Sequence, residues 1–468
     1  MSDLKNNKEL IKGIGVYAIG TFGTKILSFL IVPLYTYYIA TDDMGVYDIL
    51  TSTISLLTPI ITMQISDAAY RWIIRDDIID KEKYIRASLQ IVGLNCTCTI
   101  LIIICINRFY NIPYCLYFCL TLILSLLFHT VQKLLRGLKN QWLFAIAGLV
   151  YTTIFLGLNV IQLCFFKMGV ESLLQSAMIA NILAILLIWV LEPRLRINYF
   201  AKTDIKLVSE LCRYSIPLIP NYLNWWVINS SDRYIVLYAL GSSANGILAI
   251  AHKFPSMLQA ILNLFNNSWQ DLSVSDLKED PGAYYTSVFR IYYRLALTSL
   301  LGLIPVTKIV IMLIMSDAYK SACDFVAFYY LGTVFQSFSS FYGVGYLRSK
   351  KTGKAFSTSV YGAIVNAVVN IAFVNLIGLQ AASISTFCGF LIMWIIREKQ
   401  NRKELKILVK WHEFWSLTAV AVLMSIASIY CNLFLNFVLF IIGCGIFIIL
   451  NYQKLKQLII TLGMTRNR

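Results

Sequence analysis

Eight charged residues lie inside long apolar stretches of the sequence. Five are basic and three are acidic: Lys25, Arg233, Lys253, Arg294 and Lys308, and Asp48, Asp67 and Asp232. A charge at the centre of a bilayer costs roughly 2.5 to 3.5 kcal/mol on insertion scales, so such residues usually face a hydrated cavity, pair with one another or bind a ligand. Cations in a low-dielectric cavity attract anions strongly. The excess of cations therefore predicts a site for a polar, anionic ligand.

The positions of the lysines within their apolar stretches separate two kinds of role. Lys25 has about fourteen residues of predicted helix on either side, or roughly 20 Å at 1.5 Å per residue. It is therefore predicted to line a hydrated cavity, because its ammonium group cannot reach either surface. Lys308 and Arg290 lie near the ends of a predicted helix, where a long basic side chain can extend to water instead.

Two pairs of charged residues are close in sequence and indicate supporting roles. Asp67 and Arg71 are four residues apart, a spacing that allows one ion pair on a helix near the inner surface. Asp232 and Arg233 are adjacent, and neighbours on a helix point about 100° apart. We therefore assign Arg233 to the ligand and Asp232 to support of the helix. Together with Asp48, the acidic residues are the available carriers of a coupling proton or sodium ion.

Amide side chains cluster on the helix predicted over residues 244–271. Asn263, Asn266 and Asn267 are spaced three and four residues apart, so they share one face. Two interpretations stay open, because such amides form hydrogen bonds between membrane helices or a polar surface for a ligand. The aromatic residues, 14% of the chain, likewise suit either interfacial belts or stacking on sugar rings. We include Asn263 and Asn266 among the predicted substrate-binding residues.

The composition indicates that these charges belong to an all-α polytopic membrane protein. Of the 468 residues, 58% are hydrophobic and 14% are charged, against about 25% charged in a typical soluble domain. Apolar runs of about 20 residues predict fourteen transmembrane helices and leave no room for a soluble domain. They lie at 11–40, 44–70, 85–106, 113–135, 141–166, 171–191, 211–240, 244–271, 284–315, 321–347, 354–376, 379–397, 411–430 and 433–451.

Lysine and arginine are distributed unevenly between the two ends of these helices. With a cytoplasmic N-terminus, 32 of the 40 basic residues lie in inner segments, three lie in outer connections and five lie within spans. This asymmetry follows the positive-inside rule and predicts that both termini are cytoplasmic. The net charge of +16 is therefore explained by topology, and we expect no nucleic-acid partner.

A polar interruption at residues 192–215 divides the first twelve helices into six and six. The segments YYIATDDMGVYDI (37–49) and LYALGSSANGILAI (237–250) each combine a helix end, a short polar turn and a Gly-aliphatic start, which indicates a weak internal repeat. Many secondary transporters contain such repeats, with the substrate site between the two bundles. We therefore predict two pseudo-symmetric six-helix bundles and an additional transmembrane helix pair, over residues 1–192, 211–397 and 411–451.

Signatures of catalysis do not occur in the sequence. It has no GxxxxGK[ST] motif for ATP hydrolysis, and His129, His252 and His412 are isolated from one another. The eleven cysteines lack the CxxC pairs of zinc and redox sites. We therefore expect no enzyme, no cofactor and no metal site. A membrane glycosyltransferase or polymerase is disfavoured because it needs a catalytic carboxylate in a sizeable loop.

Two stretches of the chain resemble a known family. The segments KGIGVYAIGTFGTKILSFLIVPLYTYYIATDDMGVYDI (12–49) and SSDRYIVLYALGSSANGILAIAHKFPSML (230–258) are similar to the first, seventh and eighth helices of bacterial polysaccharide biosynthesis proteins. These are the O-antigen and capsule repeat-unit flippases of the MOP exporter superfamily. Lys25 stands where the related lipid II flippases have a cavity arginine in helix one. His252 and Lys253 match the basic position of their eighth helix less closely.

The resemblance implies a function in surface polysaccharide assembly. The implied cargo is an oligosaccharide on undecaprenyl pyrophosphate, moved by alternating access from the inner to the outer leaflet of the bacterial cytoplasmic membrane. Membrane lipid, a polysaccharide polymerase and other assembly proteins are the implied partners. Two functions of the same superfamily stay open: a lipid II flippase and a cation-coupled multidrug exporter. An exporter of cationic drugs is expected to have an acidic cavity, whereas the predicted spans of this chain contain five basic and three acidic residues.

Overall fold

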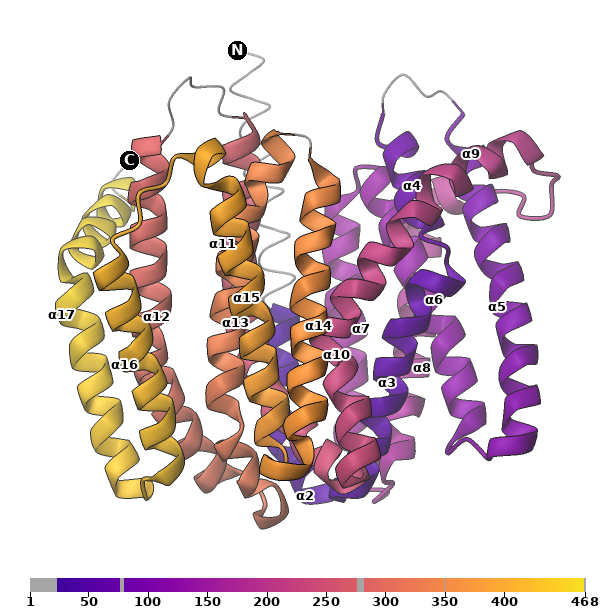
Figure 1. Ribbon diagram of the computed structural model, residues 1–468. Helices are drawn as coiled ribbons and strands as arrows, with labels where there is room; N and C mark the ends of the chain where they lie inside the picture. The colour runs from indigo at the N-terminus through magenta and orange to yellow at the C-terminus, as the bar shows by residue number, and fades with distance from the viewer. Residues whose placement is uncertain (1–22, 76–79, 276–281, 350, 467–468) are drawn as a thin grey trace. The chain divides into compact units, whose positions relative to one another are not determined.

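The computed structural model describes residues 23–75, 80–275, 282–349 and 351–466, and it contains sixteen α-helices over them. Eleven of these helices are long and apolar enough to cross a membrane, and Figure 1 shows the helical arrangement. The predicted all-α polytopic membrane fold is thus confirmed. The eleven helices are α3 (Thr41–Ile61), α5 (Glu82–Tyr110), α6 (Cys115–Gly137), α7 (Gln141–Cys164), α8 (Val170–Leu191), α11 (Ser242–Ser275), α12 (Gly282–Ile314), α14 (Thr352–Ile377), α15 (Gln380–Leu405), α16 (Trp411–Tyr430) and α17 (Leu433–Arg466).

The remaining predicted spans correspond to less apolar or partly described segments. The span predicted at 11–40 lies partly outside the described residues, and its described part is helical over 23–30 and in α2. The spans at 211–240 and 321–347 correspond largely to α10 and α13. The elements not yet given are α2 (Val32–Tyr38), α4 (Ile65–Ile73), α9 (Ile205–Ser215), α10 (Ile219–Leu240), α13 (Val326–Arg348) and the 3-10 turns η1 (Pro193–Leu195), η2 (Ile216–Leu218) and η3 (Asp317–Asp324).

The second predicted span is interrupted between α3 and α4. Met63 and Gln64 adopt a left-handed backbone, with φ of 48° and 51°, which a continuous right-handed helix excludes. Pro59 in the last turn of α3 has no N–H to donate. The Thr62 hydroxyl donates back to the carbonyl of Thr58 at 2.7 Å, a bond that competes with regular helix geometry. A hydropathy pattern does not register these backbone effects, so the sequence predicted one continuous span.

The described helices form two compact units, one up to Tyr234 and the other from Ile235 onward. In the first unit, α6 contacts α4, α5 and α8, and α7 packs on α8. In the second unit, α15 packs extensively on both α13 and α14, while α12 packs on α16 and α17 (Figure 1). The boundary between the units lies within α10, and the predicted division into bundles and an additional helix pair stays a prediction.

In the second unit, α12 and α17 approach each other very closely. A Cβ atom at Gly443 would lie 2.1 Å from the carbonyl oxygen of Leu301, so only glycine fits. Small residues allow such backbone contact between membrane helices. Two turns further along α17, the Asn451 amide donates to the Thr298 hydroxyl at 3.0 Å. These contacts fix the register of the two helices.

Candidate functional site

Two of the predicted membrane charges form an ion pair in the first unit. Arg233 of α10 lies with its Nε 2.7 Å from Oδ2 of Asp48 on α3, and the two side chains are 15% and 16% exposed. The Arg233 Nη1 also donates to the Asn229 carbonyl at 3.1 Å. The adjacent Asp232 is buried, and its carboxylate accepts from the Arg233 backbone N–H at 3.0 Å. Arg233, which we predicted to bind the ligand, is therefore held in place by Asp48, which we predicted to have a coupling or supporting role.

Hydrogen bonds next to this ion pair also join α3 to α10. The hydroxyls of Thr53 and Tyr234 lie 2.6 Å apart. The Trp226 indole N–H points to both the Ser52 carbonyl and the Ser55 hydroxyl, at 3.1 and 3.0 Å. Each of these contacts is lost if the two helices separate. The ion pair is thus the charged member of a polar seam between α3 and α10.

Lys25 lies in the same unit, on the helical residues 23–30, and its side chain is exposed. Gly23 on this segment lies against α7, where a Cβ would be 3.4 Å from a methyl group of Leu149. The segment therefore packs through its small residue and leaves the lysine away from that contact. The hydrated cavity around Lys25 stays a prediction.

The predicted ion pair between Asp67 and Arg71 is wrong. Asp67 of α4 instead pairs with Lys133 of α6 at 2.5 Å, and it accepts from the Tyr222 hydroxyl at 3.2 Å. The Arg71 guanidinium lies over the ring of Tyr214, 4.6 Å from its centroid. A spacing of four residues allows a pair between Asp67 and Arg71. In the structure, Lys133 of α6 binds Asp67 and the ring of Tyr214 lies against Arg71, and the sequence pattern shows neither of these partners.

The amides of α11 do not all share one environment. Asn263 and Asn267 are exposed, whereas Asn266 donates to the Ser337 hydroxyl of α13 at 2.8 Å. Lys253 on the same helix is half-buried. Of the two open interpretations, the contacts therefore favour a bond between helices for Asn266 and a solvent-accessible surface for Asn263.

Lys308 joins three elements of the second unit. It is buried, and its ammonium donates to the carbonyls of Ser428 and Ile429 at 2.8 and 2.7 Å. It also lies 3.3 Å from the Asp324 carboxylate in η3. A cation on the last carbonyls of a helix satisfies groups that lack a helical partner. These contacts give Lys308 a structural role at the end of α16.

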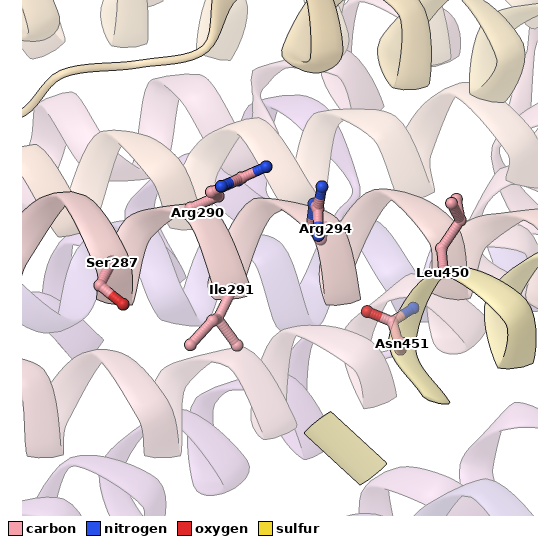
Figure 2. A pocket seen from close by; sticks show the side chains of 6 residues that line it. All are labelled: Ser287, Arg290, Ile291, Arg294, Leu450 and Asn451. Carbon is pink, nitrogen blue, oxygen red and sulfur yellow. The ribbon is translucent and has the colours of Figure 1, made fainter. Parts of the chain in front are cut away.

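Arg294 also has partners within the second unit. Arg294 and Arg290 of α12 both pair with Glu413 of α16, Arg290 at 3.0 Å. The two arginines line a cavity with residues of α17 (Figure 2). The Arg290 side chain is 36% exposed and is paired with Glu413, and its extension to water stays a prediction.

Sequence reasoning missed a buried cation in α15. Arg397 is the last residue of the span predicted at 379–397, and in the structure it is buried and donates to three neutral oxygens. They are the Thr358 hydroxyl and the carbonyls of Ser339 and Ala355, at 3.0, 2.9 and 3.3 Å. The apolar run in the sequence ends at Arg397, so hydropathy could not show that α15 continues beyond this residue and stays packed against its neighbours.

A second missed group, Glu192, follows directly after α8. Its buried carboxylate accepts from Arg194 at 2.6 and 2.9 Å and from Asn140 at 2.8 Å. Asn140 in turn caps α7 by accepting from the Leu143 N–H at 3.1 Å. The bonds from Arg194, opposed by burial, hold the pKa of Glu192 below its ordinary value of 4.5. The carboxylate thus ties the end of α8 to the start of α7.

This carboxylate makes stability depend on pH. Because its pKa is lowered on folding, its contribution is present above the ordinary pKa and is lost as the pH falls through the lowered value. We expect Glu192→Gln to destabilise the protein by about 1 to 3 kcal/mol at pH 7. Thermal unfolding in detergent should show a gap between the variant and the native protein at pH 7 that narrows near pH 3. Glu404→Gln, at an exposed position, is the control, and a gap that does not change with pH would contradict the assignment.

Comparisons with known proteins agree with this architecture. Residues 10–269, more than half of the chain, match the family described as polysaccharide biosynthesis protein. No curated protein is significantly similar to the chain in sequence. Among solved structures, the lipid II flippase MurJ in an inward closed conformation is similar with a TM-score of 0.70 and 14% identity, over 95% of this chain and 99% of that one.

Two further solved structures belong to transporters of the MOP superfamily. An inward-facing multidrug resistance MATE family transporter has a TM-score of 0.68 and 11% identity, over 83% of this chain and 98% of that one. A transporter from Pyrococcus furiosus, described by the reverse polarity of its binding pocket, has a TM-score of 0.56 and 14% identity, over 84% and 96%. The family match and the shared fold identify a multi-pass membrane protein with the fold of the MurJ and MATE structures. The chain therefore belongs to the polysaccharide biosynthesis protein family.

Proposed function

We propose that the protein is a flippase for lipid-linked oligosaccharide. It moves repeat units on undecaprenyl pyrophosphate from the inner to the outer leaflet of a bacterial cytoplasmic membrane, by alternating access and with both termini cytoplasmic. The product serves a capsule, an O-antigen or another surface polysaccharide. The observation that carries the proposal is the intramembrane ion pair of Arg233 with Asp48, in a chain of the polysaccharide biosynthesis family.

The ion pair suits a cycle of charge exchange. A guanidinium binds phosphate oxygens through two parallel N–H bonds, so a pyrophosphate can replace Asp48 as the partner of Arg233. The carboxylate that is released then binds a proton or a sodium ion, because an isolated charge in the membrane is costly. In this proposal Arg233 binds the substrate and Asp48 couples its movement to an ion.

The proposed substrate contacts are narrower than the set predicted from the sequence. Lys25 of the first unit is exposed, which supports its inclusion with Arg233. Lys253 and Asn263 belong to the second unit and stay predictions. Asn266, Lys308 and Arg294 contact other helices of the second unit, and we do not include them. Asp67 joins α4 to α6 through Lys133, and Asp232 accepts from the backbone N–H of Arg233, so we assign supporting roles to both.

Replacing Lys25 with alanine tests the proposal. The side chain is exposed, so its removal should leave the fold intact, while the loss of one charge-assisted contact to phosphate costs about 1.5 to 3 kcal/mol. We expect surface glycan to fall about tenfold or more, with lipid-linked repeat units accumulating inside. Both are measured in cells that depend on this gene, with the level of the protein in the membrane as a reference.

Lys25→Arg keeps the charge and should retain most of the glycan. Lys320→Ala removes a lysine of η3 that pairs with Asp317, and it controls for the loss of a charge elsewhere. Normal glycan from Lys25→Ala would remove Lys25 from the site. Deletion of the gene without any loss of glycan, but with greater sensitivity to cationic drugs, would favour a multidrug exporter over a flippase.

A further inference from the structure

A cavity lies between α12 and α17, and the proposed function does not use it. We call it the Arg290–Arg294 pocket, and it has a volume of about 160 Å³. Figure 2 shows the two arginines on α12 and Asn451 on α17 among the residues that line it. The lining residues are Ser287, Arg290, Ile291, Arg294, Leu450 and Asn451. All of them belong to the second unit.

The pocket lies where the apolar part of α17 ends. The candidate membrane span of α17 covers Leu433–Tyr452 among the described residues. The sequence after it begins with Gln453 and Lys454, so Leu450 and Asn451 lie at the end of the apolar run. The hydrogen bond of Asn451 to Thr298 aligns this end of the run with α12, one turn away from Arg294. Lipid headgroups begin where the apolar span stops. The pocket is therefore at the depth of the headgroups of one leaflet.

The charge of the pocket is positive. Arg290 donates through Nε and Nη2 to Oε2 of Glu413, at 3.2 and 3.0 Å, and the Nε of Arg294 donates to Oε1. One carboxylate thus faces two guanidinium groups, each of which has five N–H donors. The arginine side chains are 36% and 34% exposed, whereas that of Glu413 is 20% exposed. Among the described residues, the two guanidinium groups share a single carboxylate, and this excess of positive charge and of N–H donors points to an anion.

The size of the pocket selects the kind of anion. Sites for drug-sized ligands measure about 300 to 1,000 Å³, so 160 Å³ is too small for an oligosaccharide. It is sufficient for a phosphate with part of a glycerol. Leu450 is exposed at the rim, and it continues into the exposed apolar side of α17, along which acyl chains can lie. Basic pockets between membrane helices bind anionic lipid headgroups by this combination of charge and apolar surface.

We propose that the Arg290–Arg294 pocket binds the headgroup of an anionic phospholipid. The phosphodiester accepts from the two arginines, and Ser287 and Asn451 lie beside it as further polar contacts. The lipid bridges α12 and α17, and it neutralises the charge that Glu413 leaves uncompensated. The site is separate from the residues proposed for transport, and it does not depend on the proposed function.

Lipid binding to the purified full-length protein in a neutral detergent tests this site. Phosphatidylglycerol is expected to bind, as counted by native mass spectrometry, and to raise the temperature of thermal unfolding, whereas zwitterionic phosphatidylcholine should do neither. The double variant Arg290→Gln, Arg294→Gln should bind phosphatidylglycerol at least about tenfold more weakly, which corresponds to roughly 1.4 kcal/mol. The double variant Arg108→Gln, Lys167→Gln removes two exposed cations, and its affinity should match that of the native protein.

Three results would overturn the site. They are unchanged affinity in the arginine double variant, equal binding of phosphatidylcholine by the native protein, and binding of undecaprenyl pyrophosphate without binding of phosphatidylglycerol. If the double variant does not fold, Arg290→Gln alone removes the more exposed guanidinium, and the same loss or retention of affinity decides the question. No transport is measured, so failure here leaves the flippase proposal unaffected, and failure of that proposal leaves this site unaffected.

Discussion

Replacing Arg233 with alanine is expected to lower transport by about 100-fold or more, since each charge-assisted bond to phosphate contributes roughly 1.5 to 3 kcal/mol and a bidentate contact removes two. The variant also leaves Asp48 without its partner at 2.7 Å. Cells that carry it should lose surface glycan and accumulate lipid-linked repeat units, while the protein stays in the membrane. Glycan staining and quantification of the lipid-linked intermediates measure the effect.

Exchanging the charges of Asp48 and Arg233 distinguishes a role of Arg233 in substrate binding from a purely structural role. The double variant Asp48→Arg, Arg233→Asp restores an ion pair between α3 and α10, but it moves the cation to the other helix. We expect this variant to recover thermal stability relative to Arg233→Ala and to remain inactive. Arg233→Lys, which keeps a point charge without the bidentate geometry, should have intermediate activity. Full transport by the exchanged variant would show that only the ion pair matters.

Replacing Gly443 with valine is expected to cause the largest loss of stability. The new Cβ would lie 2.1 Å from the Leu301 carbonyl oxygen and 3.0 Å from the Gly302 nitrogen, both of them backbone atoms that cannot rotate away. Overpacking typically costs 1 to 3 kcal/mol, and more where backbone must move. We expect about 3 kcal/mol or more here, seen as a lower unfolding temperature in detergent and a lower level of protein in the membrane.

Gly445→Val is the matched control for this substitution. It lies two residues further along α17, and a Cβ there would have no atom within 4 Å among the described residues. Its unfolding temperature should stay close to that of the native protein. If both variants were equally stable, the close approach of α12 and α17 would be contradicted.

Composition and apolar run length were sufficient to predict the membrane fold, because burial of backbone in lipid requires long helices. The interruption between α3 and α4 could not be predicted in this way, since it depends on the left-handed backbone of Met63 and Gln64 in a segment that stays apolar. Likewise, hydropathy ended the predicted span at Arg397, although packing against α13 and α14 buries this residue.

The membrane charges themselves were recognisable from the sequence, but their partners were not. Asp48 and Arg233 are far apart in the chain, and their contact depends on which faces of α3 and α10 meet. The expected pair of Asp67 with Arg71 failed for the same reason, since Lys133 reaches Asp67 from another helix. Which charged residues form ion pairs depends on how the helices pack, and a single sequence does not determine that packing.

The left-handed backbone of Met63 and Gln64 interrupts the helix directly after α3. This point is a pivot about which α3 can tilt. Asp48 lies fifteen residues before Met63, or roughly 22 Å along the axis, so a tilt of about 10° at the pivot moves it by roughly 4 Å. Such a displacement separates an ion pair of 2.7 Å. On the other side of the pivot, Asp67 stays anchored to Lys133 and Tyr222. A small rotation at Met63 and Gln64 would therefore move Asp48 away from Arg233, while the contacts of Asp67 would hold the other side of the interruption in place.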